Sequence, residues 1–107
     1  MDDFLYKSLL YDYYNGLLTD KQREIYAMYY HNDMSLSEIA ENGKTTPQAV
    51  SDMLKRVNKL LIKYEDNLKL VENRAIIKEK LELVAELAEA NNTGRIKEIL
   101  AEILDSI

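Results

Sequence analysis

Apolar residues recur at helical spacing through the second half of the chain. From position 50 they follow one another at alternating steps of four and three residues, the heptad pattern of a helix packed along one face. This first seam consists of Val50, Leu54, Val57, Leu61, Tyr64, Leu68, Val71 and Ala75. A second seam follows out of phase with it, formed by Ile77, Leu81, Val84 and Ala88. Because a β-strand alternates every two residues, this half of the chain is predicted to be helical.

The first half of the chain carries a separate start signal for each helix. Thr19 and Ser35 each precede a Gln or Glu by three residues, which is the spacing of a capping box. Thr46 can cap a further helix, and Pro47 then stands at its first position, where a missing N–H is harmless. These signals and the seams predict helices over residues 3–15, 19–30, 35–42, 46–65, 67–90 and 94–106, with no strand.

The stretch SLSEIAENGKTTPQAVSDMLKRV, residues 35–57, fits the pattern of a helix-turn-helix. The two helices of that motif cross steeply, so a small residue is needed where their backbones approach. Ala40 supplies the small residue and Ile39 the apolar position before it. Val50 and Met53 fall where the second helix must bury side chains. We therefore expect Ala40 and Val50 to be buried against each other's helices.

The turn of this motif departs from the usual pattern. The pattern has a large apolar residue, a glycine and an apolar residue, where this chain has Gly43, Lys44 and Thr45. A left-handed backbone at Lys44 would cost roughly 1 kcal/mol. The alternative is that Gly43 takes the turn one residue early.

Positive charge is concentrated in the second half of the motif. Residues 44–63 carry five Lys and Arg against one Asp, whereas the whole chain has a net charge of −5. Residues 1–43 carry three cations against eight acids, and residues 64–107 carry six against ten. Any contact with nucleic acid is therefore expected on one strip and not over the whole surface.

The candidate nucleic-acid surface is the exposed face of the helix that begins at Pro47. A glutamine can read an adenine edge, and cations can hold phosphates. The candidate binding residues are Gln48, Ser51, Lys55, Arg56 and Lys59, with Asp52 on the same face. The alternative is a solvated helix face without a binding role.

Nothing in the sequence points to catalysis, a metal or a cofactor. The chain has no cysteine and no Gly-rich phosphate loop, and its single His31 has neither a second His nor a nucleophile beside it. Seven of the eight tyrosines lie in residues 6–30, at a spacing that predicts a core with polar rims. The absence of a long uncharged apolar run and of a signal-peptide pattern predicts a cytoplasmic protein without membrane insertion.

Residues 5–70 resemble a known family. LTDKQREIYAMYYHNDMSLSEIAENGKTTPQAVSDMLKRVNKLL is similar to region 4 of sigma factors and still more similar to the YlxM family of Gram-positive bacteria and their wall-less relatives. That family also shares LLYDYYNGLLTDKQREIY and KRVNKLLIKYEDNLKL. Where its members commonly have L-G-x-S-R-Q-A-V, this chain has GKTTPQAV, so Thr46 replaces the serine cap and Pro47 replaces an arginine that would contact DNA.

The resemblance implies an all-helical, helix-turn-helix protein that binds DNA and acts beside components of the signal recognition particle. We predict an all-α chain: a sigma region 4-like head without a winged helix, residues 1–66, and a helical tail, residues 67–107, packed as one compact unit. The apolar surface from Leu61 to Ile107 exceeds what the head can cover, which predicts a homodimer through the tail. Two alternatives to DNA binding are binding of structured RNA by the same basic segment and a protein-interaction adaptor that no longer binds nucleic acid.

Overall fold

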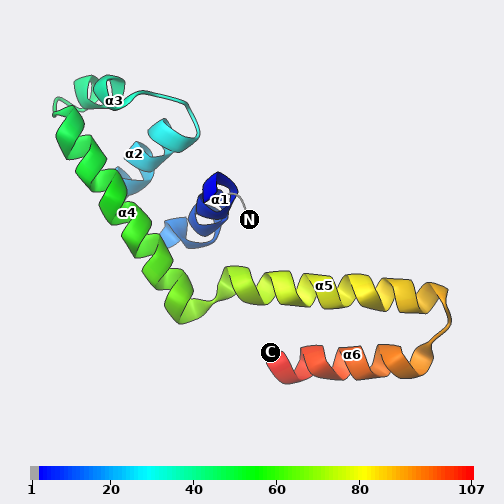
Figure 1. Cartoon of the computed structure of the whole chain (residues 1–107). Helices are drawn as coiled ribbons and strands as arrows, with labels where there is room; N and C mark the ends of the chain where they lie inside the picture. The colour runs from blue at the N-terminus through cyan, green and yellow to red at the C-terminus, as the bar shows by residue number, and fades with distance from the viewer. Residues whose placement is uncertain (1–2) are drawn as a thin grey trace. The chain divides into compact units, whose positions relative to one another are not determined.

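The computed structural model describes residues 3–107, and within this range every regular element is a helix (Figure 1). The predicted all-α class is confirmed for these residues, and each predicted helix is present within a few residues of its expected bounds. The elements are α1 Asp3–Tyr14, a short 3-10 turn η1 Asn15–Leu17, α2 Asp20–Tyr30, α3 Leu36–Asn42, α4 Pro47–Leu68, α5 Leu70–Glu89 and α6 Thr93–Ser106.

The chain divides into two compact units. The first runs through Lys69 and contains α1 to α4, and the second, Leu70–Ile107, contains α5 and α6. Lys69 caps the C-terminus of α4 with a left-handed backbone (φ 55°), and its N–H donates to the carbonyl of Glu65. A left-handed residue cannot continue an α-helix, so the run of helix from α4 stops there.

Both predicted capping boxes are present, at Thr19 with Gln22 and at Ser35 with Glu38. The Thr19 hydroxyl accepts a hydrogen bond from the backbone N–H of Gln22 at 3.2 Å, and the Gln22 side chain accepts one from the N–H of Thr19 at 2.9 Å. Each box satisfies donors that the first turn of a helix leaves without partners. The starts of α2 and α3 are therefore encoded locally.

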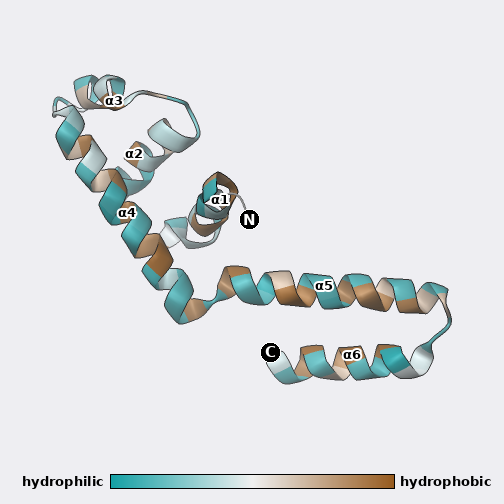
Figure 2. Ribbon diagram, viewed as in Figure 1, coloured by the Kyte–Doolittle hydropathy of each residue, from teal (hydrophilic) through white to brown (hydrophobic). Residues whose placement is uncertain are grey.

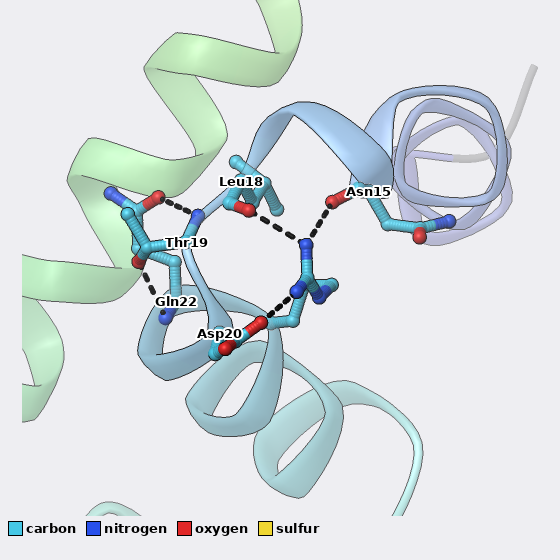
Figure 3. A network of polar contacts seen from close by, with 6 residues as sticks. Asn15, Leu18, Thr19, Asp20 and Gln22 are labelled. Atoms are coloured by element: carbon cyan, nitrogen blue, oxygen red, sulfur yellow. Dashed lines mark hydrogen bonds and ion pairs between the residues drawn. The ribbon is translucent and has the colours of Figure 1, made fainter.

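Arg23 closes the turn between α1 and α2, and Figure 3 shows its partners. Its Nη1 donates to the backbone carbonyls of Asn15 at 3.1 Å and of Leu18 at 2.7 Å, and its Nη2 pairs with Asp20. Backbone carbonyls at the end of a helix lack hydrogen-bond donors within that helix, and one guanidinium group can donate to several of them. Arg23 thus holds the entry to α2 in place and is engaged within the fold.

Helix α4 is the element on which the other helices of the first unit pack, since α1, α2 and α3 all contact it. Brown and teal bands alternate along it, as expected for a helix with one apolar and one polar face (Figure 2). The first four positions of the predicted first seam form its buried row: Val50, Leu54, Val57 and Leu61. This part of the seam is confirmed.

The first seam is interrupted beyond Leu61, and of its four later members only Val71 is buried. The next buried side chain of α4 is that of Glu65, whereas Tyr64 is half-buried and Leu68 is 50 % exposed. An α-helix has 3.6 residues per turn, so a strict 3.5-residue repeat drifts around its surface over several turns. Position 65 takes over the inward direction, and Glu65 accepts a hydrogen bond from the Tyr14 hydroxyl of α1.

An aromatic cluster joins α1 to α2. Tyr26 is fully buried and stacks between Tyr11 and Tyr30, with ring centroids 4.8 Å and 4.4 Å away. Burial, followed by the neighbouring Tyr30 and Tyr11, raises the pKa of the Tyr26 hydroxyl well above its usual value. The core role predicted for the tyrosines holds for this cluster.

The second unit is an antiparallel pair of helices, α5 and α6 (Figure 1). The Asn92 side chain caps α6 by accepting a hydrogen bond from the N–H of Arg95 at 3.2 Å. Ile99 and Ile103 of α6 are buried, and an ion pair of 3.6 Å joins Lys80 to Glu102 across the pair. No helix within residues 3–107 is both long and apolar enough to span a membrane.

The predicted second seam is only partly buried. Ile77 and Val84 are half-buried, whereas Leu81 and Ala88 are exposed. Within its unit α5 packs against α6 alone, which covers one strip along its surface. The four residues of the seam span a wider arc around α5 than this strip. Leu81 and Ala88 are therefore not covered within the single chain.

Candidate nucleic-acid interface

Helices α3 and α4 pack as the two helices of a helix-turn-helix. Ile39 and Ala40 of α3 are each 2 % exposed, and Val50 of α4 is 1 % exposed. These are the positions where the motif needs close packing, and the predicted burial of Ala40 and Val50 is confirmed. Met53, one turn further along α4, is half-buried.

The turn between these helices is a Schellman motif with Lys44 at its left-handed position. The N–H of Thr45 donates to the carbonyl of Ala40 at 2.9 Å, and the N–H of Lys44 donates to that of Glu41 at 3.3 Å. Lys44 has a φ of 54°, whereas Gly43 has a φ of −94°. The alternative in which Gly43 takes the left-handed turn is therefore wrong. Glycine adopts a left-handed backbone most readily, but the glycine of this turn is at position 43, one residue before the left-handed position.

The start of α4 is well capped and presents its first turn to solvent. The Thr46 hydroxyl accepts a hydrogen bond from the N–H of Ala49 at 3.2 Å, and Pro47 occupies the first helical position, as predicted. The remaining N–H groups of the first turn carry the positive end of the helix dipole. This end of α4 is thus weakly attractive to phosphate even though Pro47 brings no charge.

The predicted binding residues gather on the exposed face of α4. Gln48, Lys55 and Lys59 follow one another at helical spacing and form one row, with Arg56 beside Lys59. All four are exposed. Ser51 is half-buried at the boundary between this row and the core. The structure therefore brings four of the five predicted side chains together in solvent and places the fifth at their edge.

Asp52 belongs to the same row and is bonded to Gln48. The Gln48 amide Nε2 donates to Oδ1 of Asp52 at 3.0 Å. Sequence reasoning placed Asp52 on this face and missed the bond, although glutamine and aspartate four residues apart on a helix is a known favourable pair. The bond orients the one candidate base-reading side chain and sets a carboxylate beside it.

The cations of α4 begin only in its third turn. Lys55 lies eight residues after Pro47, or about 12 Å along the helix axis at 1.5 Å per residue. In helix-turn-helix complexes the first turns of the second helix meet the base edges. Here those turns carry Gln48 and Asp52, while exposed cations lie at Lys44 in the turn and from Lys55 to Lys63. Lys63, which the prediction left out, extends the strip.

Helix α3, which packs on α4, exposes two acidic side chains. Glu38 and Glu41 are both exposed, and Glu38 is held at the helix start by its capping box. In helix-turn-helix complexes the first helix crosses the phosphate backbone. Acidic side chains there repel the phosphates and weaken binding. The arrangement can therefore bind a polyanion through α4 alone, with an affinity limited by its neighbours.

Other candidate chemistry is not assembled in the part of the chain that the structure describes. No group of three His, Cys, Asp or Glu side chains within residues 3–107 could hold a metal ion. His31 packs its ring edge-on against Tyr11, with centroids 5.1 Å apart. The exposed face of α4 is accordingly the strongest candidate for a functional surface.

Comparison with known proteins gives a consistent set of matches. Residues 1–103 match the model of the family UPF0122, described as "Putative helix-turn-helix protein, YlxM / p13 like". A UPF0122 protein of Clostridium novyi is 40 % identical over all of this chain and 96 % of its own length. UPF0122 proteins of Caldanaerobacter subterraneus and Clostridium perfringens are 51 % and 46 % identical, covering 79 % and 94 % of this chain and 73 % and 91 % of their own lengths.

Proposed function

Since this chain belongs to the YlxM/p13-like helix-turn-helix family, we propose that it is a regulatory DNA-binding protein that acts through α4. One observation carries the proposal. Residues 44–63 carry five cations against one acid in an acidic chain, and four of these cations lie on the exposed face of the second helix of a well-packed helix-turn-helix. A solvated face without function has no reason to collect the cations of an acidic chain in this one place.

In the proposed complex α4 lies in the major groove. Lys55, Arg56 and Lys59 hold phosphates, and Gln48 reads a base edge near the helix start. Ser51 adds a short-range hydroxyl contact at the edge of the row. The Gln48 amide donates one of its two N–H groups to Asp52, which leaves the second N–H and Oε1 to read an adenine. Three phosphate contacts correspond to a salt slope of about −3 on logarithmic axes.

Structured RNA is a second candidate ligand for the same strip. The cations of α4 lie beyond its first two turns, which suits contacts to backbone phosphates more than contacts to base edges. Proteins recognise RNA helices mainly through shape and phosphates, because their major groove is too narrow to be read. The resemblance to the family extends the proposal to a role beside the signal recognition particle in the cytoplasm.

A protein-interaction adaptor is the third candidate function, and the acidic side chains on and near the α4 row support it. Asp52 stands within the row on α4, and Glu38 and Glu41 stand on the neighbouring helix. A mixed-charge surface of this kind suits a protein partner with complementary charges. Under this candidate the helix-turn-helix is retained as a scaffold and the α4 row binds no polyanion.

Fluorescence anisotropy with a labelled mixed-sequence DNA duplex and a labelled RNA hairpin tests these candidates. We expect binding at low salt, about 50 mM, that weakens steeply as salt rises. The double variant Arg56→Ala/Lys59→Ala should lose most of that binding. Lys21→Ala/Lys97→Ala removes the same charge from exposed positions outside the row and should lose little.

The pattern of binding separates the candidates. Preference for the duplex supports the proposed function, and preference for the hairpin supports the RNA candidate. Equal losses in the two double variants would show general electrostatic attraction and would remove α4 as the site. If the chain binds neither probe at low salt, the protein-interaction adaptor is the candidate that remains.

A further inference from the structure

One side of the α5–α6 pair is apolar and exposed. Leu81 of α5 is 49 % exposed, and Leu100 and Leu104 of α6 are 40 % and 71 % exposed. The buried side chains Ile99 and Ile103 mark the direction of α6 that faces α5. Helical spacing and the antiparallel direction place the exposed leucines of both helices on the same side of the pair. We call this surface the hairpin face and define it as Ile77, Leu81, Ala85, Ala88, Leu100 and Leu104.

The opposite side of the pair is acidic. Glu79 and Glu86 of α5 line a groove there with Glu102 of α6. Ile76 and Leu83 also line this groove, so its apolar side chains are interspersed with charges, whereas those of the hairpin face are adjacent to one another. Leucines exposed to this extent on two adjacent helices form a contiguous patch, and such patches mark sites of association.

The outer edge of the hairpin face carries charges in a definite order. On α5, Lys78 comes before Leu81 and Glu82 and Glu89 come after it. Along α5 the edge is therefore basic toward the N-terminus and acidic toward the C-terminus. A surface with this polarity complements an antiparallel copy of itself and repels a parallel copy.

We propose that the hairpin face packs on the same face of a second copy of this chain, with each α5 antiparallel to the partner's α5. A twofold axis perpendicular to the middle of α5 passes close to Lys80, since the helix runs from Leu70 to Glu89. Lys78 and Glu82 are equally far from that point, so Lys78 meets the partner's Glu82 at two symmetric places. Leu81 lies next to the axis and meets the partner's Leu81. The two pairs of helices form a four-helix bundle.

The available surface is large enough for a stable dimer. Twenty residues of α5 are about 30 Å long, and two adjacent helices are about 20 Å wide, so each copy offers roughly 600 Å². The pair of copies then buries roughly 1,200 Å², which reaches the lower limit for specific, stable interfaces. The apolar centre and charged edge of the face match the anatomy of such interfaces.

Dimerisation goes beyond the proposed function and does not depend on it. A twofold dimer presents two helix-turn-helix motifs together, as dimeric DNA-binding proteins do. The adaptor candidate would equally present two copies of its docking surface. Failure of nucleic-acid binding and failure of dimerisation are therefore separate results.

Sedimentation velocity of the full chain over a range of concentrations tests the pairing. We expect a dimer at tens of micromolar. Leu81→Gln should raise the dissociation constant at least tenfold, because it places an amide at the centre of the apolar contact. Leu83→Gln is the matched control, since Leu83 has a comparable exposure of 36 % and lines the acidic groove instead. Helix content by circular dichroism should be unchanged in both variants.

Charge reversal tests the antiparallel arrangement itself. Lys78→Glu sets an acid against the partner's Glu82 at both symmetric places and should weaken the dimer severalfold. Adding Glu82→Lys reverses both members of each pair and should restore the dimer. Loss of association in the single variant without recovery in the double variant would overturn the arrangement.

Cross-linking gives a readout that does not depend on affinity. The chain has no cysteine, so Leu81→Cys introduces a single thiol next to the proposed axis. Mild oxidation should convert it to a disulfide-linked dimer, because a disulfide needs Cα atoms within about 7 Å. Glu79→Cys, on the acidic side, should form no disulfide-linked dimer under the same treatment. A native chain that sediments as a monomer at every concentration, or equal cross-linking at both positions, would overturn the proposal.

Discussion

The hydroxyl of Tyr14 donates a hydrogen bond of 2.5 Å to Oε1 of Glu65, across 51 residues of sequence and within the core of the first unit. The bond joins the end of α1 to the last turns of α4. Both side chains are buried, with exposed fractions of 1 % for Tyr14 and 7 % for Glu65. A hydrogen bond to a buried carboxylate contributes more to stability than one between neutral groups, because the carboxylate has given up its hydration.

Removing this bond should destabilise the fold measurably. Tyr14→Phe keeps the ring and its packing and withdraws one donor from Glu65, which should lower the free energy of unfolding by about 2 kcal/mol. Urea denaturation followed by circular dichroism measures the difference. Tyr29→Phe, at a tyrosine that is 37 % exposed, provides a comparison variant. A loss at Tyr14 no larger than about 0.5 kcal/mol would show that this bond contributes little in solution.

The turn of the helix-turn-helix should be improved by moving its glycine. Lys44→Gly relieves a left-handed lysine and should raise the free energy of unfolding by about 1 kcal/mol. Gly43→Ala should be tolerated, because the added methyl group would meet the carbonyl of Ile39 at an ordinary 3.5 Å and φ there is −94°. Thermal unfolding of both variants measures this. A destabilised Lys44→Gly variant would contradict the assigned turn.

Stability should fall at high pH through Tyr26. The pKa of this hydroxyl is raised by burial, and so the folded state holds the proton more tightly than the unfolded state does. The stabilisation is fully present below the ordinary tyrosine pKa near 10 and is lost as pH rises above it toward the folded value. Urea midpoints at pH 8 and above pH 10 test this. Tyr26→Phe should show a smaller decline than the native chain, and an equal decline would assign the effect to other groups.

Two substitutions at the start of α4 should strengthen binding to nucleic acid. Asp52→Asn removes the acid from the row while keeping its shape, and Pro47→Arg adds a cation at the first helical position. Each should increase affinity several-fold at low salt, since each changes the local charge by one unit in favour of phosphate. Asp66→Asn, on the same helix but far from its start, should have little effect. Anisotropy titrations with DNA compare them, and unchanged affinity in both variants would place the ligand elsewhere.

The elements that were predicted from the sequence are those with local causes. The start of α2 needs only Thr19 and Gln22, and the start of α4 only Thr46 and Pro47. The burial of Ala40 against α4 follows from a motif whose two helices are adjacent in sequence. In each case the residues that fix the structure lie within a short window of the chain.

The features that the sequence patterns did not predict depend on which hydrogen-bond partner a side chain finds in the fold. Glu65 replaces Tyr64 in the core because Tyr14, from a distant helix, supplies a donor at that place. The bond between Gln48 and Asp52 is local, but exposed polar side chains at this spacing can equally point to solvent or to a ligand, so the spacing alone does not predict it.

The salt dependence of binding tests the central claim, that α4 holds nucleic acid through Lys55, Arg56 and Lys59. The native chain should show a slope of log affinity against log salt of about −3, and Arg56→Ala/Lys59→Ala should flatten it by about two units. Lys21→Ala/Lys97→Ala should leave the slope unchanged. Absence of binding to DNA and RNA at low salt, or equal flattening in the two double variants, would contradict the account.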